Sequence, residues 1–180
     1  MGHEAGTVPS GSPEPGRPDR SNLLGGTGEG QRRSCGGGPQ VPPGDDLSDF
    51  GTDSAARFGR TLDRHTKRLS RRLPRGAQHW GLARKLLNIY LRDCLYCTYL
   101  NTEFHLAPAE ALFEVPLDSI TARGLKQATG RGALPVWPGV RHLRPDVNAE
   151  FQRFAADLAR GDHIARVHLD AVYWSMGRDE

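Results

Sequence analysis

The sequence has only three cysteines, at positions 35, 94 and 97, and they do not make a disulfide framework. No apolar run approaches the roughly 20 residues that a membrane-spanning helix needs, and no continuous apolar segment follows the first methionine as in a secretory signal. We therefore expect a soluble, cytoplasmic protein that has no membrane partner. Alternation of apolar and polar residues, which is typical of a half-buried strand, is also missing, so the predicted fold is all-α.

Large apolar side chains are scarce in the first 50 residues, which contain 12 glycines and 7 prolines. A segment of this composition cannot bury enough apolar surface to offset the entropy lost when it is ordered. We predict that residues 1–50 form a disordered tail and that residues 51–180 form one compact helical domain.

Acidic residues are nearly absent between Arg57 and Arg92, where 11 lysines and arginines accompany a single acid, Asp63. Such a one-sided concentration of charge indicates an anionic partner, and nucleic acid is the first candidate. The alternative is a basic helix face that is simply solvated.

Apolar residues at helical spacing, together with capping residues, predict a series of helices. The first covers residues 52–73, with Thr52 or Asp53 as its cap. The second covers residues 78–100 and is apolar on nearly every side, which places it in the middle of the core. The later predicted helices start at Asp118 or Ser119, at Asp146 or Asn148, and at Asp162, and a helical turn follows Pro108.

Motifs that would reveal a metal, nucleotide or hydrolase site are missing, including HExxH, GxSxG, the P-loop and GxGxxG. Cys94 and Cys97 have CxxC spacing, but they lie within a predicted helix without a second pair, which favours ordinary packing over metal binding. His168 is interpreted as a core histidine with a satisfied hydrogen bond, whereas His79 is interpreted as packing, or as a ligand contact near a helix start. We expect no metal and no cofactor.

Two charged residues stand at the edges of the predicted core. Lys85 lies in the first turns of the helix that contains "GLARKLLNIYL", and Asp118 lies at the start of a later helix. A partly desolvated lysine can act as a nucleophilic amine, and a carboxylate beside it can stabilise a cationic sugar and move protons. Such a pair would suit attack at a sugar C1′ with a base as the leaving group. The alternatives are a solvated lysine and an aspartate that only caps its helix.

Three stretches, "GLARKLLNIYL", "EVPLD" and "HLDAVYWSMGR", occur in the same order as similar stretches of the helix-hairpin-helix DNA glycosylases of the endonuclease III superfamily. The resemblance covers about residues 78–178, and its spacing is closest to the archaeal oxidised-guanine glycosylases. It leaves open a reduced member, a fragment or a degenerate relative. The fold that it implies is part of the helix-hairpin-helix glycosylase fold, without the iron–sulfur cluster of some members.

The resemblance implies a DNA-repair N-glycosylase, with or without AP-lyase activity, that acts on double-stranded DNA with a damaged base. It places the Schiff-base lysine at Lys85 and the catalytic aspartate at Asp118. Two other functions remain open from the residues alone: a non-catalytic nucleic-acid-binding module and a protein-interaction domain. The residues expected to contact DNA are Arg71, Arg72, Arg75, Gly81 and Arg84.

Overall fold

Helices make up all the regular secondary structure of residues 46–130 and 132–176, the part of the chain that the computed structural model describes. The α-helices are α1 (Ala55–Arg72), α2 (Trp80–Tyr96), α3 (Thr98–Glu103), α4 (Ser119–Thr129), α5 (Pro145–Gly161) and α6 (Leu169–Met176). The 3-10 helices are η1 (Leu47–Phe50), η2 (Ala107–Leu112), η3 (Val140–His142) and η4 (Arg166–His168). The all-α prediction is therefore confirmed for these residues, and none of their helices is long and apolar enough to cross a membrane.

The helical domain begins before residue 51, the boundary that the composition predicts. Leu47 and Phe50 of η1 are buried in the core. The Phe50 ring packs edge-on against the ring of Phe58 in α1, with 5.5 Å between the ring centroids. The apolar pair within "DLSDF" therefore belongs to the core and not to the tail. The predicted disorder of residues 1–45 lies outside the described residues.

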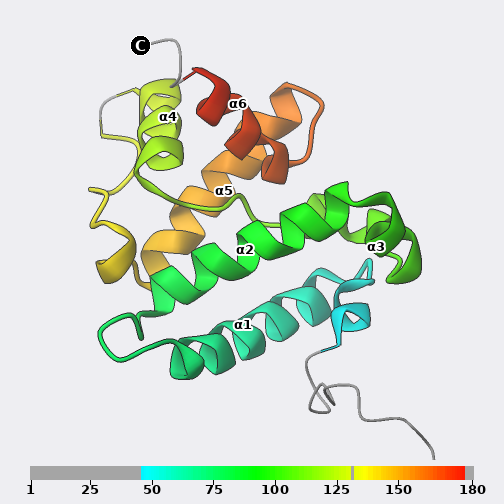
Figure 1. Ribbon diagram of the computed structural model, residues 1–180. Coiled ribbons are helices and arrows are strands. Elements are labelled where there is room, and N and C mark those ends of the chain that lie inside the picture. Colours follow the sequence, from blue (N-terminus) through cyan, green and yellow to red (C-terminus); the bar gives the residue numbers. More distant parts are fainter. Residues whose placement is uncertain (1–45, 131, 177–180) are drawn as a thin grey trace, which may run out of the picture. The chain divides into compact units, whose positions relative to one another are not determined.

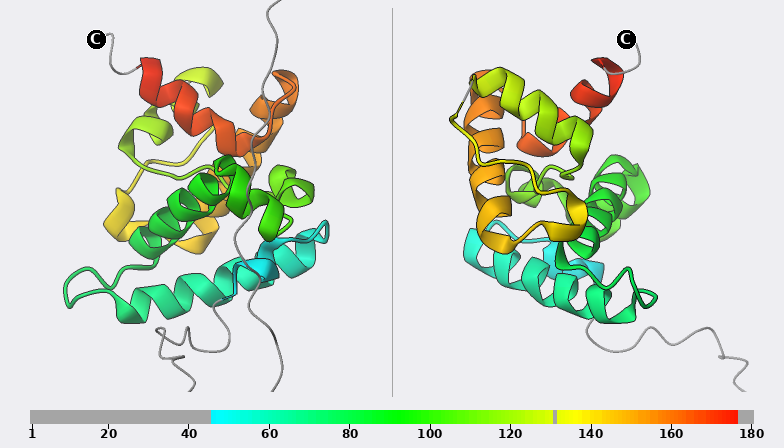
Figure 2. Two further views of the ribbon diagram at one scale, coloured as in Figure 1. Left: turned by 45° about the vertical axis from the view of Figure 1, so that its right-hand side comes forward. Right: turned by 90° about the vertical axis from the view of Figure 1, so that its left-hand side faces the viewer.

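Helix α1 lies along α2 with its thin apolar stripe turned inward. Phe58 and Leu62, two of its apolar residues at helical spacing, are buried at the contact. The predicted caps Thr52 and Asp53 are wrong, because the Ser54 hydroxyl accepts the hydrogen bond from the backbone N–H of Arg57. In Figures 1 and 2, α1 lies on one side of α2, and α4 and α6 lie on the other side.

Helix α2 lies at the centre of the fold, but it is not surrounded by core. Its side chains Leu87, Leu91 and Leu95 are buried, whereas Tyr90 is 55% exposed. The predicted helix over residues 78–100 is in fact two helices, because the backbone at Cys97 is extended (φ −79°, ψ 108°) and α3 starts after it. The expectation that apolar residues on nearly every side indicate full burial is therefore wrong for α2.

The second apolar cluster joins α4, α5 and the start of α6. Its buried members include Leu117, Leu125, Phe151 and Leu169. Helix α6 begins at Leu169, so Asp162 is not its cap; Asp162 instead follows the end of α5. The extended segment between η2 and α4, which contains Glu114 and Val115, connects this cluster to the first one.

Candidate active site

Lys85 and Asp118 form an ion pair between α2 and the first turn of α4. The Lys85 Nζ lies 3.2 Å from the Asp118 Oδ2. The other carboxylate oxygen, Oδ1, accepts hydrogen bonds from the backbone N–H groups of Ile120 and Thr121, both at 2.9 Å. Asp118 is therefore an N-cap and an ion-pair partner at the same time, with one oxygen for each role.

The pair faces a cleft of about 500 Å³. The Lys85 side chain is 24% exposed and the Asp118 side chain is 8% exposed, so solvent reaches the amine more freely than the carboxylate. The cleft is lined by Lys85, Ile89, Arg92, Pro116, Asp118, Asp170, Ala171 and Trp174. A molecule in this cleft would contact the amine and the carboxylate together.

Asp170, at the start of α6, is a second carboxylate of the cleft and was not predicted as a site residue. It pairs with Arg92 of α2, and its Oδ1 accepts a hydrogen bond from the Thr121 hydroxyl at 3.1 Å. Burial raises the pKa of the Asp170 carboxyl, against the opposing effects of Arg92 and Thr121, and the charge of Asp118 raises it further. The available signal in the sequence was a single acid in the apolar stretch "HLDAVYW".

Trp174 gives the cleft a flat apolar wall. Its side chain lies one turn after Asp170 on α6 and is 44% exposed. An exposed indole beside an amine and two carboxylates suits a ligand that has both an aromatic ring and a polar part.

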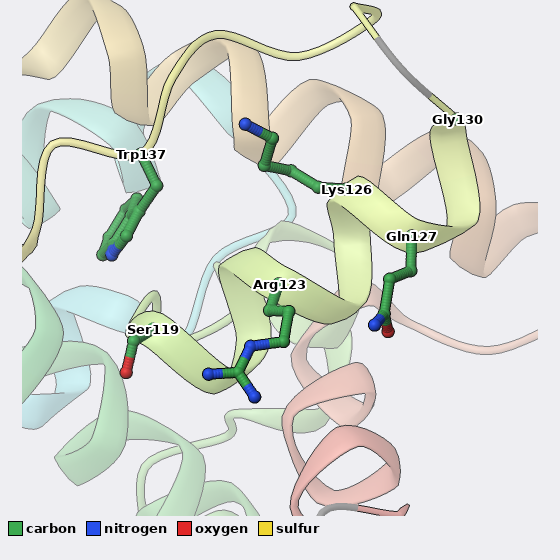
Figure 3. A pocket seen from close by; sticks show the side chains of 6 residues that line it. All are labelled: Ser119, Arg123, Lys126, Gln127, Gly130 and Trp137. Carbon is green, nitrogen blue, oxygen red and sulfur yellow. The ribbon is translucent and has the colours of Figure 1, made fainter.

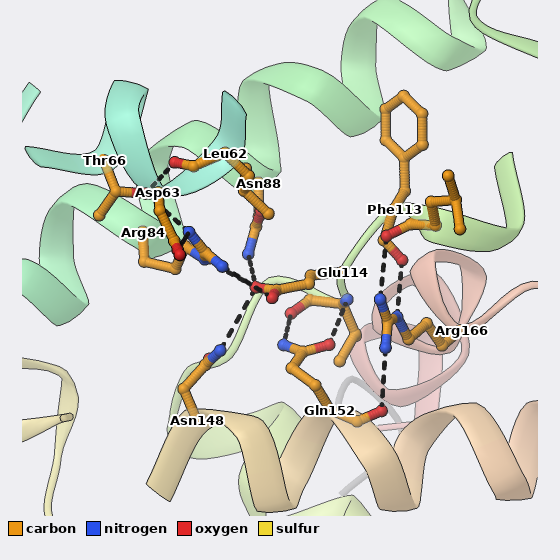
Figure 4. A network of polar contacts seen from close by, with 12 residues as sticks. Leu62, Asp63, Thr66, Arg84, Asn88, Phe113, Glu114, Asn148, Gln152 and Arg166 are labelled. Carbon is orange, nitrogen blue, oxygen red and sulfur yellow. Dashed lines mark hydrogen bonds and ion pairs between the residues drawn. The ribbon is translucent and has the colours of Figure 1, made fainter. Parts of the chain in front are cut away.

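Arg84, which we expected to contact DNA, lies in the core with only 6% of its surface exposed. Its guanidinium donates two hydrogen bonds to Glu114, at 2.8 and 2.9 Å, one to Asp63 at 2.9 Å and one to the Thr66 hydroxyl at 3.0 Å. Figure 4 shows the Glu114 carboxylate at the centre of this network. We therefore interpret Arg84 as a structural residue that joins α2 to α1 and to the segment before Asp118.

Glu114 keeps its charge in this buried network. Burial alone would raise the pKa of its carboxyl, but the hydrogen bonds and charge of Arg84, with help from Asn88 and Arg166, hold the pKa below its ordinary value. Val115, the residue after Glu114, is held by the side-chain amide of Gln152 in α5. Its N–H donates to the Gln152 Oε1 at 3.0 Å, and its C=O accepts from the Gln152 Nε2 at 2.8 Å. The segment that leads to Asp118 is thus held from α2 on one side and from α5 on the other.

Gly81, the other predicted DNA contact on α2, lies where α2 closely approaches the η3 segment. A Cβ atom at this position would lie 2.3 Å from the carbonyl oxygen of Val140 and 2.6 Å from the Cβ of Leu143. Only glycine fits between these atoms without a shift of the backbone. The structure therefore gives Gly81 a packing role at the contact between α2 and η3.

We expect Gly81→Ala to lower the free energy of unfolding by about 1–3 kcal/mol, because the added methyl group overpacks this contact. Gly59→Ala is the matched control, since a Cβ atom at Gly59 in α1 has no neighbour within 4 Å. That control should stabilise the protein by up to about 1 kcal/mol through helix propensity. Chemical denaturation measures both changes, and equal effects of the two substitutions would contradict the packing role.

Arg71, Arg72 and Arg75 are exposed at the end of α1 and in the turn after it. None of the three lines the cleft, whose arginine is Arg92. The structure therefore brings Lys85 and Asp118 together but leaves the predicted basic residues on a separate surface.

Cys94 and His168 make structural contacts. Cys94 is buried, its thiol pKa is raised chiefly by burial, and neither it nor Cys97 is in a disulfide. The ring of His168 bonds the Tyr96 hydroxyl at 2.8 Å and the Glu110 carboxylate at 2.6 Å, so its hydrogen bonds are satisfied as predicted. Its side chain is 28% exposed, however, so the prediction of a core position is wrong. Within the described residues, no group of three or more His, Cys, Asp or Glu side chains could hold a metal ion.

Comparisons with protein-family models, with curated proteins and with solved structures find no match to this chain. The cleft combines an amine, a carboxylate in contact with it, a second carboxylate with a raised pKa, and an exposed indole. These groups are suited to covalent and proton-transfer chemistry on an aromatic substrate.

Proposed function

We propose that the protein is a DNA-repair N-glycosylase with AP-lyase activity, and that it acts on a flipped damaged base through Lys85 and Asp118. The observation that carries the proposal is the 3.2 Å contact between the Lys85 amine and the Asp118 carboxylate in one open cleft. The order of the three stretches that resemble the helix-hairpin-helix glycosylases supports the same role.

In this mechanism the carboxylate of Asp118 accepts a proton from the Lys85 ammonium, and the free amine attacks C1′ of the damaged nucleotide. The C1′–N bond to the base breaks, and the base leaves with its bonding electrons and takes the proton that Asp118 holds, which restores the carboxylate. The restored charge of Asp118 stabilises the cationic sugar–amine adduct, and the carboxylate then accepts a proton from the adduct nitrogen. The C1′–O4′ bond breaks, O4′ takes that proton, and the Lys85 nitrogen and C1′ form a protonated imine that permits cleavage of the strand.

Trp174 and Asp170 complete the proposed site. The exposed indole of Trp174 offers a stacking surface for the flipped base, and such stacking contributes about 1–3 kcal/mol per base. Asp170, with its raised pKa, is the second group of the cleft that can hold a proton.

Borohydride trapping tests the proposed function, because borohydride reduces the imine and leaves a stable covalent complex with DNA. We expect the wild-type protein to trap at least one member of a panel of duplexes with an abasic site, oxidised guanine or another damaged base. Lys85→Ala should abolish the trapping. Trapping by wild type that is no stronger than trapping by Lys85→Ala would overturn the proposal.

A second candidate function, non-catalytic nucleic-acid binding, is favoured by one surface of α1. Lys67, Arg71 and Arg75 recur every four residues, and Arg60 lies two helical turns before Lys67. All four are exposed and have no carboxylate partner within the described part of the chain. This spacing places them along one face of the helix and its end, where they can contact successive phosphates.

Arg71→Ala combined with Arg75→Ala should weaken binding to undamaged duplex DNA and flatten its salt dependence. The slope of log K against log salt should decrease by about 0.9 for each phosphate contact that is lost. Arg153→Ala, an exposed arginine on α5, is the control and should leave the slope unchanged. Duplex binding measured over a salt series checks this prediction. An identical slope for wild type and the double variant would remove α1 from the interface, and undetectable binding at low salt would favour a protein-interaction domain.

A further inference from the structure

A second hollow of about 600 Å³ lies along α4, outside the cleft of Lys85. It is lined by Ser119, Arg123, Lys126, Gln127, Gly130 and Trp137. Its volume falls within the range of about 300–1,000 Å³ that is typical of small-ligand sites. Figure 3 shows the indole of Trp137 beside α4 and the long side chains that extend from that helix.

The wall from α4 is the outward face of an amphipathic helix. Thr121, Ala122 and Leu125 of this helix are buried, whereas Arg123 and Gln127 are exposed one turn apart. The opposite wall is the indole of Trp137. This ring packs edge-on against Phe151 of α5, with 5.6 Å between the ring centroids and an interplanar angle of 77°. This contact fixes the ring and leaves it only half-buried.

The hollow has a concentration of positive charge. Neither Arg123 nor Lys126 has a carboxylate partner within the described residues. Two such cations favour an anionic ligand, and the guanidinium fork of arginine is suited to phosphate. The amide of Gln127 can both donate and accept hydrogen bonds, which suits the edge of a nucleobase.

We propose that this hollow binds a nucleotide, with its base against Trp137 and its phosphate on Arg123 and Lys126. The proposal is independent of the chemistry of Lys85 and Asp118. The nucleotide has two sources with the same chemistry: a free mononucleotide, or one nucleotide of a bound strand.

Calorimetric titration of the full chain with dGMP, with a single-stranded oligonucleotide and with inorganic phosphate tests the site. Arg123→Ala combined with Lys126→Ala should weaken nucleotide binding at least tenfold, as should Trp137→Ala. Arg153→Ala on α5 should leave it unchanged. Circular dichroism confirms that each variant is folded, and the charge variants alter only the outward face of α4.

The outcomes separate the two sources and the two proposals. Binding of dGMP that depends on these three residues identifies a free nucleotide, and binding of the oligonucleotide alone with the same dependence identifies a strand. Equal affinity for inorganic phosphate and dGMP, or binding that is unaffected by all three residues, would overturn the proposal. A protein that binds dGMP here but traps no damaged DNA would refute the glycosylase function and leave this site intact.

Discussion

Replacing Glu114 with alanine should lower the free energy of unfolding by about 3–5 kcal/mol, the cost expected when one partner of a buried ion pair is removed. The variant leaves the Arg84 guanidinium in the core with Asp63 as its remaining acidic partner, and the Asp63 side chain is 60% exposed. Because typical domains are stable by only about 5–15 kcal/mol, the variant should be marginally folded.

The matched control is Glu150→Ala, because Glu150 is exposed on α5 and its side chain makes no ion pair or hydrogen bond within the described residues. Its effect should stay within about 0.5 kcal/mol. Glu114→Gln keeps the shape of the side chain without its charge and should fall between the two. Urea denaturation followed by circular dichroism measures all three, and a loss below about 1 kcal/mol for Glu114→Ala would contradict the account of the network.

The pH dependence of the same variants provides an independent check. Because the pKa of Glu114 is lowered in the folded protein, its contribution to stability is complete above the ordinary value of 4.5. That contribution should decline as the pH falls below this value toward the folded pKa. The difference in stability between wild type and Glu114→Gln should therefore shrink on acidification, whereas a difference that is constant between pH 7 and pH 3 would contradict the lowered pKa.

Under the proposed glycosylase mechanism, Asp118→Asn should reduce base release by about 10²–10⁴-fold, the range that positioned proton-transfer groups contribute. Asparagine is about as good an N-cap as aspartate, so α4 should keep its capping bonds and most of its stability. The substitution removes only the negative charge that faces Lys85. Base release from the damaged duplex that wild type processes best is the measurement.

Asp146→Asn is the matched control for charge, because Asp146 pairs with Arg144 at the exposed start of α5. It should release the base at the wild-type rate. Asp118→Ala separates the two roles of Asp118, since it should lose the activity and also about 1 kcal/mol of capping energy. Full activity of a stable Asp118→Asn variant would reduce Asp118 to a structural cap.

Local rules were sufficient for much of the secondary structure. The cap of α4 was predicted as Asp118 or Ser119, and the structure selects Asp118 because its carboxylate reaches two free N–H groups. The helical turn at Pro108 was predicted in the same way. The start of α5 was placed at Asp146 or Asn148, which is wrong, because the helix begins at Pro145 with Arg144 as its cap residue. Capping and turn residues act within a few positions along the chain, so a single sequence shows the candidate caps but does not always select among neighbours.

Burial was much harder to predict, because it depends on contacts between distant segments. Arginine is usually exposed, yet Arg84 is buried because Glu114, 30 positions away in the sequence, folds against it. Tyr90 belongs to an apolar stretch, yet it is exposed because no element covers that side of α2 in the described part of the chain. Asp170 joins the cleft only when α6 packs beside α2 and α4, and no spacing along the sequence specifies that contact.

The most direct test of the central claim is to identify the residue that forms the adduct with DNA. The sequence contains only three lysines, Lys67, Lys85 and Lys126. After borohydride trapping and proteolysis, the peptide that contains the adduct therefore identifies the lysine. Lys67→Ala and Lys126→Ala are the controls, because Lys67 lies on the exposed face of α1 and Lys126 lines the other hollow. We predict that peptide mass spectrometry finds the reduced sugar adduct on Lys85 and that both control variants still form the adduct at this residue. An adduct on Lys67, on Lys126 or on the N-terminal amine, or no adduct with any damaged duplex, would contradict it.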